Sequence, residues 1–393
     1  ALEGNDGDGS GGISLTQDSK RYYPYGDLAA HVLGFCNSEG GAYGVEAIYN
    51  DVLEGTVGRV VTTRTGTGVE MYDSYSEYVD AEDGCDLTLT IDTTIQSYAE
   101  RILEEGIKAY DVQRGGWCVV LDPQTGAVLA MASSPDYDPN QYGTIRDESL
   151  RAQVEADVQA ELEKRQGEKA EGKTDEEIYQ EAVNAATGTA QNKQWRSQAV
   201  NDTYEPGSTF KALVLAAALE EGVVSESDTF YCPGYYMVEG WPKPISCSKK
   251  APGHGTQTLA EAVQNSCNPA FMQIGQRLGI EKFYEYFQAF GLTEPTNIDL
   301  NGEGVSTVWP LNTMTGVDLA VGSFGQRFTV TPIQMITAVC AVVNGGYLVQ
   351  PHIVSKIVDN EGNVVEEFEP TAKRQVISEE TSAALRSMME DVV

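Results

Sequence analysis

The sequence predicts an α+β protein of two domains, a small one followed by a large one. Its 393 residues exceed what one ordinary hydrophobic core accommodates. Between residues 21 and 85, short apolar runs are broken by glycine and show little sustained helical period, which is typical of a small α+β domain. After residue 92, a long amphipathic segment followed by two apolar segments marks the start of the second domain.

The elements of the second domain can be predicted in order. Residues 92–110 have helical spacing of their apolar positions, and residues 117–133 form an apolar strand, a Pro/Gly turn and a second apolar strand. Residues 141–192 are dense in Glu, Lys and Gln, which favours a solvated helical insertion over an interaction arm. Residues 352–368 predict another hairpin, and residues 378–393 predict a helix without a stop signal, so we expect the chain to end within an element.

The charge excludes two classes of partner. The chain has 26 Lys and Arg against 59 Asp and Glu, a formal net charge of −33, which repels nucleic acid and anionic lipid. The longest apolar run, residues 333–343, is too short to cross a bilayer and predicts a buried helix. The three histidines leave few candidates for a mechanism that needs one, and we expect His31 and His352 at the surface or at strand edges.

The stretch TYEPGSTFK, residues 203–211, places a serine and a lysine three residues apart. If a helix begins near Pro206-Gly207, Ser208 and Lys211 lie on one face of it. A buried lysine loses its proton far below its solution pKa, so Lys211 would be able to accept the proton of Ser208 and create a nucleophile without histidine. The alternative is a capping serine beside a solvated lysine.

A second polar motif follows in TLAEAVQNSCNPAF, residues 258–271. Thr258 and Glu261 predict a capping box at the start of a short helix, and a further helix is expected from Pro269. Ser266 and Asn268 would then project from the connection between the helices, with Cys267 pointing the other way. The alternative is that Asn268 only caps the second helix.

Ser-x-x-Lys followed by Ser-x-Asn matches two of the three signatures of penicillin-binding proteins and class A β-lactamases. Outside the insertion, longer stretches resemble class B penicillin-binding proteins, the monofunctional transpeptidases, over nearly the whole chain. These stretches are RYYPYGDLAAHVLGF, GVEAIYNDVLEGTVG, VVLDPQTGAVLAMASSPDYDPN, YEPGSTFK and GHGTQTLAEAVQNSCNPAF.

The resemblance implies a fold and a location. It implies a pedestal, or dimerisation-like, domain over residues 1–85 and a penicillin-binding/serine β-lactamase-like transpeptidase domain over 86–393, with an antiparallel sheet flanked by helices and the charged insertion at 141–192. It also implies the extracytoplasmic face of a bacterial membrane, an N-terminal transmembrane anchor outside the given sequence, and a cell-wall glycosyltransferase as partner.

The resemblance also implies a reaction. Ser208 would be the acylated nucleophile and Lys211 its general base, Ser266 would relay a proton to the leaving D-alanine, and Asn268 would bind the substrate backbone. The substrates would be peptidoglycan stem peptides ending in D-Ala-D-Ala, cross-linked by acyl transfer, and β-lactams would acylate Ser208 and remain attached. The serine mechanism needs no cofactor.

The third family signature, Lys-Thr-Gly, is expected on a strand after Ser-x-Asn, and no such triplet occurs in the sequence. We therefore expect the given sequence to stop before that strand, which would supply an oxyanion donor and hold the substrate carboxylate.

Cys232, Cys247 and His254 lie close together between the two serine motifs. Three such ligands suit a structural Zn²⁺, with a fourth ligand from Asp228, Cys267 or water. A Cys232–Cys247 disulfide suits an exported domain equally and would act as a redox switch beside the site. A third interpretation is two buried free thiols and a loop histidine.

Two other functions share these motifs. A serine β-lactamase would use the same residues but needs neither an N-terminal domain of this size nor the insertion, and it would release its acyl product. A non-catalytic penicillin-binding scaffold would keep the fold and bind wall-synthesis partners, but the presence of all four polar residues argues against it.

Overall fold

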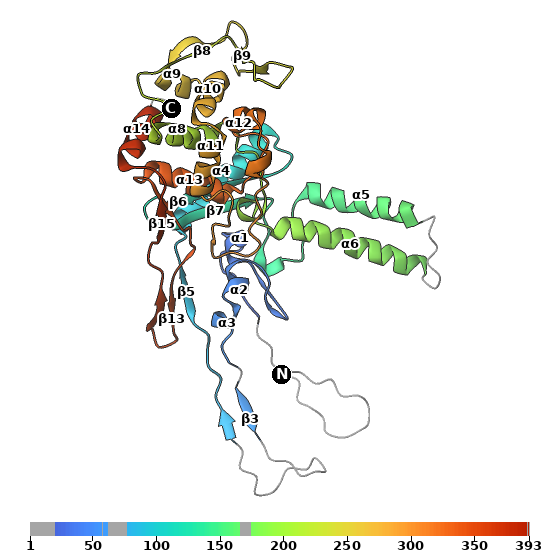
Figure 1. The fold of residues 1–393 in the computed structure, drawn as a ribbon. Coiled ribbons are helices and arrows are strands. Elements are labelled where there is room, and N and C mark those ends of the chain that lie inside the picture. The colour runs from blue at the N-terminus through green and yellow to red at the C-terminus, as the bar shows by residue number, and fades with distance from the viewer. Residues whose placement is uncertain (1–19, 57, 62–76, 166–173, 391, 393) are drawn as a thin grey trace, which may run out of the picture.

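The computed structural model describes residues 20–56, 58–61, 77–165, 174–390 and 392. The N-terminal domain is assembled from short elements, as its glycine-broken sequence predicts. These are α1 (Ala30–Leu33), β1 (Cys36–Asn37), β2 (Gly40–Gly41), α2 (Gly44–Ile48), α3 (Asn50–Leu53), β3 (Arg59–Val61) and β4 (Glu77–Val79). β3 and β4 pair antiparallel, and β3 lies at the end of the molecule farthest from β8 (Thr229–Cys232) and β9 (Tyr235–Tyr236) (Figure 1).

The strands of the second domain pair antiparallel, with helices on the sheet. β6 (Gly116–Leu121) pairs with β7 (Val128–Ser134), and α4 (Thr93–Tyr110) packs on both strands through Ala99, Ala130 and Ala132. β5 (Asp86–Leu89) pairs with β13 (Val354–Val358), which pairs in turn with β14 (Val364–Glu367). The predicted α+β class and both predicted hairpins are confirmed.

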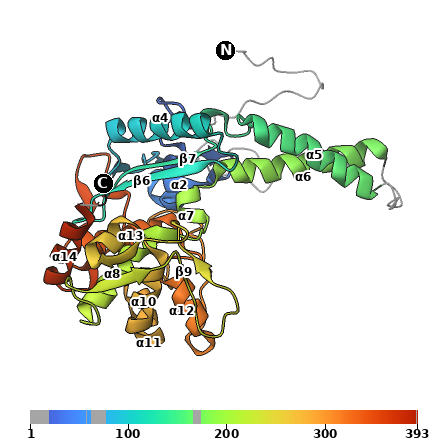
Figure 2. The ribbon, with the colours of Figure 1, turned by 90° about the horizontal axis from the view of Figure 1, so that it is seen from above.

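The insertion consists of two long helices that project from the domain (Figures 1 and 2). α5 (Glu148–Arg165) and α6 (Asp175–Trp195) pack on each other through a narrow apolar seam that includes Val158, Ala182 and Ala186. Their other faces are largely exposed, because the sequence supplies few apolar positions beyond that seam.

Most of the remaining chain forms a helical body, with β8 and β9 at the end of that body next to α9 (Leu259–Gln264) and α10 (Asn268–Leu278) (Figure 1). Its helices are α7 (Gln198–Asn201), η2 (Gly207–Phe210), α8 (Lys211–Glu220), α9, α10, α11 (Ile280–Ala289), η3 (Leu311–Thr313), α12 (Gly316–Gly322), α13 (Pro332–Val343) and α14 (Glu379–Glu390). The short helix η1 (Pro139–Gln141) lies instead beside the N-terminal domain, where the side chain of Asn140 bonds the backbone of Tyr23. The strands of the body are β8 (Thr229–Cys232), β9 (Tyr235–Tyr236), β10 (Ile245–Ser246), β11 (Gly255–Thr258), β12 (Tyr347–Val349) and β15 (Ala372–Gln375).

The largest hydrophobic core surrounds α8 and receives side chains from α10, α11, α13 and α14. The apolar run at 333–343 is the buried helix α13, as predicted. Among the described residues, no helix combines the length and the hydropathy that a membrane span requires.

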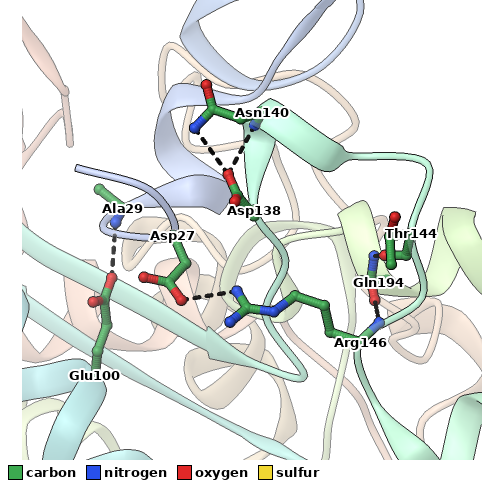
Figure 3. A network of polar contacts seen from close by, with 8 residues as sticks. All are labelled: Asp27, Ala29, Glu100, Asp138, Asn140, Thr144, Arg146 and Gln194. Carbon is green, nitrogen blue, oxygen red and sulfur yellow. Dashed lines mark hydrogen bonds and ion pairs between the residues drawn. The ribbon is translucent and has the colours of Figure 1, made fainter. Parts of the chain in front are cut away.

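Polar contacts join the N-terminal domain to α4 and to the base of the insertion (Figure 3). The backbone N–H of Ala29 donates to Glu100 Oε1 on α4 at 2.8 Å, and burial raises the pKa of the Glu100 carboxyl. Arg146 Nη1 lies 2.8 Å from Asp27 Oδ2, and the backbone N–H of Arg146 donates to Gln194 Oε1 on α6 at 3.0 Å. The base of the insertion is therefore tied to the N-terminal domain, which is itself tied to α4.

His31 is buried at this junction, so the prediction of a surface or strand-edge position was wrong. Its Nε2 lies 3.0 Å from the carbonyl oxygen of Gln194, and its ring packs edge-on against Tyr137. Burial lowers the pKa of His31 to about 4, so the imidazole is neutral at pH 7. His352 does lie at a strand edge, where it forms an isolated bridge with Ala127.

Candidate active site

Helix α8 positions the first motif from inside the largest core. Residues 213–218 are all buried, so the helix is apolar around its whole circumference rather than along one stripe. The exception is Lys211, the first residue of the helix, whose side chain is only 4% exposed. The core therefore fixes where this lysine emerges.

The residues before α8 form the short helix η2, which carries Ser208 in an exposed position. Tyr204 and Val330 exchange two backbone hydrogen bonds, at 2.9 and 3.1 Å. The N–H of Gly207 donates to the carbonyl of Gly325 at 2.8 Å. These bonds hold the chain on the N-terminal side of Ser208 against a loop more than a hundred residues away.

That supporting loop has a demanding backbone. Gly325 has φ +81°, and a Cβ there would lie 2.0 Å from the carbonyl oxygen of Gly207, so no other residue fits without displacement. Arg327 has φ +68°, its N–H donates to Glu205 Oε1 at 2.7 Å, and its guanidinium pairs with Asp318 at 2.8 Å. A non-glycine residue at positive φ persists only where surrounding contacts hold it.

The structure brings the four polar residues of the two motifs together around one nitrogen. Lys211 Nζ lies 3.2 Å from Ser208 Oγ and 2.9 Å from Ser266 Oγ. It also lies 2.7 Å from the carbonyl oxygen of Ser266 and 2.7 Å from Asn268 Oδ1. Ser208 and Ser266 therefore approach the same amine, which is the geometry needed for proton exchange between them.

The second motif is presented as a connection between two helices. α9 begins with the predicted capping box between Thr258 and Glu261, and Ser266, with φ +45°, turns the chain toward α10. Cys267 is fully buried, whereas the side chains of Ser266 and Asn268 face Lys211. Asn268 is the first residue of α10, and its side-chain oxygen bonds Lys211 rather than capping the helix.

The electrostatics of the site favour a neutral lysine. Lys211 forms no ion pair with any residue that the structure describes, and its partners are hydroxyl, carbonyl and amide oxygens. Burial lowers the pKa of Lys211 to about 8, and the neighbouring sulfur atoms of Cys247 and Cys267 act in the opposite direction. At pH 7 about one amine in ten is therefore neutral, a far larger fraction than the ordinary pKa of 10.5 would give.

Four soft ligands gather behind the second motif. The sulfur atoms of Cys232, Cys247 and Cys267 and a ring nitrogen of His254 all lie within 4.8 Å of one another. Cys247 Sγ is 3.7 Å from His254 Nδ1 and 4.0 Å from Cys267 Sγ. Of the three candidates for a fourth ligand, the structure places Cys267 in the cluster. Asp228 instead pairs with Arg277 at 2.6 Å.

The sequence alone did not indicate the loop that supports Ser208. The stretch GSFGQR at 322–327 offers only glycine and turn chemistry, and nothing in it indicates contact with Gly207. The sequence alone also did not indicate Phe271, whose ring lies 5.4 Å from Lys211 Nζ and forms an apolar wall of the site.

Two models of known protein families match this chain. A model described as the penicillin-binding protein transpeptidase domain matches residues 116–393, and one described as the penicillin-binding protein dimerisation domain matches residues 5–89. The chain belongs to the penicillin-binding proteins. The resemblance to the class B members of this family is confirmed.

Two curated relatives and one solved structure illustrate the kinship of this penicillin-binding protein. Stage V sporulation protein D of Bacillus subtilis is 38% identical over 385 residues, which cover 97% of this chain and 52% of that protein. The peptidoglycan D,D-transpeptidase FtsI homolog of Mesostigma viride is 29% identical over 414 residues, covering 97% of this chain and 60% of that protein. The chain thus spans little more than half the length of these relatives.

The solved structure is penicillin-binding protein 3 of Mycobacterium tuberculosis complexed with aztreonam. It superposes with a TM-score of 0.71 at 26% identity, over 94% of this chain and 68% of that one.

Proposed function

We propose that this penicillin-binding protein is a D,D-transpeptidase that cross-links peptidoglycan stem peptides through an acyl-enzyme on Ser208. The observation that carries the proposal is the contact between Ser208 Oγ and Lys211 Nζ at 3.2 Å. The Lys211 amine is buried and has no carboxylate partner among the described residues. Such an amine is a base of the strength that a serine nucleophile requires near pH 7.

The first half-reaction follows from this contact. Neutral Lys211 accepts the hydroxyl proton of Ser208 as Oγ attacks the carbonyl carbon between the two D-alanines. The C–N bond then breaks, and the departing D-alanine takes a proton from Lys211 through Ser266, whose Oγ lies 2.9 Å from the same nitrogen. In the second half-reaction, an amine of a neighbouring stem peptide attacks the ester, forms the new amide and returns the proton to Ser208.

Asn268 suits the role of a substrate-binding residue. Its Oδ1 is occupied by Lys211, while its Nδ2 makes one long contact of 3.4 Å to the carbonyl of Ser246. Donor capacity therefore remains for a carbonyl of the substrate backbone.

The same chemistry makes β-lactams the expected inhibitors. The aztreonam complex of the tuberculosis relative supports β-lactam binding by this fold. A cell-wall glycosyltransferase partner and action at the extracytoplasmic face, where peptidoglycan lies, stay predictions that accompany this function.

The test is covalent labelling of the full-length natural protein with a fluorescent penicillin, read by intact mass spectrometry. We expect a lasting adduct that is absent from Ser208→Ala and strongly slowed in Lys211→Ala. No adduct on the wild-type protein would favour the scaffold alternative. An adduct that disappears with release of hydrolysed penicillin would favour a β-lactamase.

We further propose that Cys232, Cys247, His254 and Cys267 hold a structural Zn²⁺. Ligand sulfurs around a tetrahedral zinc lie about 3.8 Å apart for a Zn–S distance of ~2.3 Å. The Cys247–Cys267 separation of 4.0 Å is close to this value. A disulfide would use two of these four groups and leave the other two unexplained, and all seven cysteines are free thiols in the structure.

The proposed zinc would act on the shape of the site and take no part in the reaction. Cys267 lies between Ser266 and Asn268, so a metal bound to its sulfur would fix the connection that presents both residues to Lys211.

Native mass spectrometry separates the metal from the disulfide. Zinc adds about 63 Da and is lost on acidification, whereas a disulfide lowers the mass of the denatured protein by about 2 Da relative to the free thiols. We expect Cys232→Ser to lose the metal and Cys118→Ser, a half-buried cysteine on β6, to keep it. A wild-type protein without bound zinc after expression in zinc-supplemented medium would contradict the proposal.

A further inference from the structure

The hairpin β9–β10 and its loop expose an unusual set of apolar side chains beside the catalytic residues. Tyr235 is 44% exposed, Met237 is 54% exposed and Trp241 is 45% exposed, all within seven residues of sequence. In a soluble domain, exposed large apolar residues gathered in one segment indicate a contact surface rather than ordinary scatter.

The charge of this segment is opposite to that of the whole chain. Residues 229–258 contain three lysines, Lys243, Lys249 and Lys250, and a single acidic residue, Glu239, whereas the chain carries −33. None of these lysines forms an ion pair with a residue that the structure describes. Lys249 and Lys250 lie between Cys247 and His254, two members of the cysteine and histidine cluster. Lys243 lies on the hairpin loop, outside that stretch, so it is the lysine that can be changed without altering the cluster.

The hairpin is firmly seated on the catalytic domain. Val238 is 3% exposed and packs with Met272 of α10 and Phe324, while its neighbours Met237 and Glu239 are exposed. On β9, Tyr236 donates its hydroxyl proton to Gln276 of α10 at 2.7 Å. The exposed side chains therefore project from an anchored support, which is what a binding surface requires.

The hairpin also adjoins the proposed catalytic residues. The carbonyl of Ser246, on β10, accepts from Asn268 Nδ2 at 3.4 Å, and Asn268 Oδ1 lies 2.7 Å from Lys211 Nζ. The hairpin is thus two hydrogen bonds from the base. Figure 1 shows β9 and its loop at the end of the molecule opposite β3.

We propose that the exposed face of the β9–β10 hairpin, formed by Tyr235, Met237, Trp241 and Lys243, binds the peptidoglycan strand that carries the reacting stem peptide. The inference rests on the proposed transpeptidase function. The aromatic rings pack on the apolar faces of the sugar rings, and Lys243 pairs with a stem-peptide carboxylate. The surface holds the polymer outside the catalytic centre. It therefore contributes to the binding of a polymeric substrate but not to the reaction with a small β-lactam.

Charge complementarity favours this occupant. The strand carries stem-peptide carboxylates, and the hairpin is a basic and aromatic segment in an acidic protein, so an anionic polymer is directed to this face. An anionic membrane would also match lysines and aromatics, but it would meet the −33 charge of the whole chain, whereas a slender strand need only contact the hairpin.

The test compares two double variants of the full-length protein. Trp241→Ala with Lys243→Ala alters the hairpin surface. Tyr179→Ala with Lys164→Ala is the control, because it removes the same kinds of side chain from the exposed faces of α6 and α5. The probe is a fluorescently labelled, uncross-linked disaccharide-pentapeptide oligomer, with binding followed by anisotropy and Ser208 acylation by penicillin measured in parallel. Vesicles containing anionic phospholipid provide a second binding assay.

We expect the hairpin variant to lose about tenfold or more in affinity for the oligomer, as removal of an aromatic and a charged contact does at other interfaces. The ratio of oligomer binding to penicillin acylation should fall by the same factor, and the control should match the wild type. Unchanged oligomer affinity, equal losses in both readouts, or binding to vesicles that depends on Trp241 would each overturn the proposal. If the wild type bound the oligomer through the hairpin but was never acylated, this inference would stand while the transpeptidase proposal failed.

Discussion

The acylation rate should depend on pH through Lys211. Burial lowers the pKa of Lys211 to about 8, compared with the ordinary value of 10.5. At pH 7 the neutral fraction is then about one in ten instead of about one in three thousand, a gain of roughly 300-fold in active base. Because the neutral amine accepts the proton of Ser208 in the proposed mechanism, the rate should rise about tenfold per pH unit from pH 6 to near pH 8 and level off above pH 9.

Besides Lys211 itself, the titratable groups that act on the amine are the thiols of Cys247 and Cys267, which raise the pKa of Lys211 when they are charged. The direct contacts of the amine are Ser208, Ser266 and Asn268, which carry no charge in this range. The carboxylate of penicillin titrates far lower, near the pKa of an α-carboxyl group at about 3.5.

The assay is stopped-flow acylation by a fluorescent penicillin between pH 6 and 10, with protein-free samples to subtract alkaline hydrolysis of the lactam. In Lys211→Arg, whose guanidinium stays charged, the rate should fall by more than about a thousandfold at every pH. A rate that is flat over this range, or one that still rises tenfold per pH unit up to pH 10, would refute the argument that burial lowers the pKa of Lys211.

Three further predictions concern the framework. His31→Gln keeps a donor for the carbonyl of Gln194 but cannot titrate. Since burial lowers the pKa of His31 to about 4, the wild type should lose about 3 kcal/mol of stability through this residue as the pH falls from about 6.5 to 4, and the variant should not. Identical Tm profiles against pH would contradict the claim that His31 is buried in its neutral form. Gly325→Ala places a methyl group 2.0 Å from the carbonyl oxygen of Gly207, so it should lower the Tm and slow acylation at least tenfold, because the strain falls on the turn before Ser208. A wild-type acylation rate would show that the loop does not position Ser208. Leu213→Ala opens a cavity in the core around α8 and should cost about 3–5 kcal/mol in urea unfolding, whereas a loss under 1 kcal/mol would place α8 outside the main core.

Local patterns in the sequence were sufficient for the elements that carry the site. The period of 3.6 identifies α4, and the alternation of apolar runs with Pro/Gly turns identifies the hairpins around residues 122 and 360. The capping box at Thr258 and Glu261 could also be predicted from the sequence, because its two partners are only three residues apart.

The assembly of the site involves longer distances. Ser266 meets Lys211 across 55 residues, and only the resemblance to a known family linked the two motifs beforehand. The burial of His31 depends on Gln194, 163 residues away, and no periodicity near His31 reports that contact. Cys267, not Asp228, is the fourth member of the cluster, because Asp228 forms an ion pair with Arg277, 49 residues away in the sequence.

The sequence by itself determined that this protein has an α+β fold, that Ser208 and Lys211 share one helical turn, and that Ser266 and Asn268 flank a cysteine, because each of these depends on neighbours within a few residues. The tertiary structure alone decided that Lys211 is buried with no counter-ion among the described residues, that the loop at Gly325 supports the turn before Ser208, and that a basic, aromatic hairpin lies beside Asn268. These features arise where segments far apart in the chain exclude water from one another, and the free energy of that packing is not a property of any one segment.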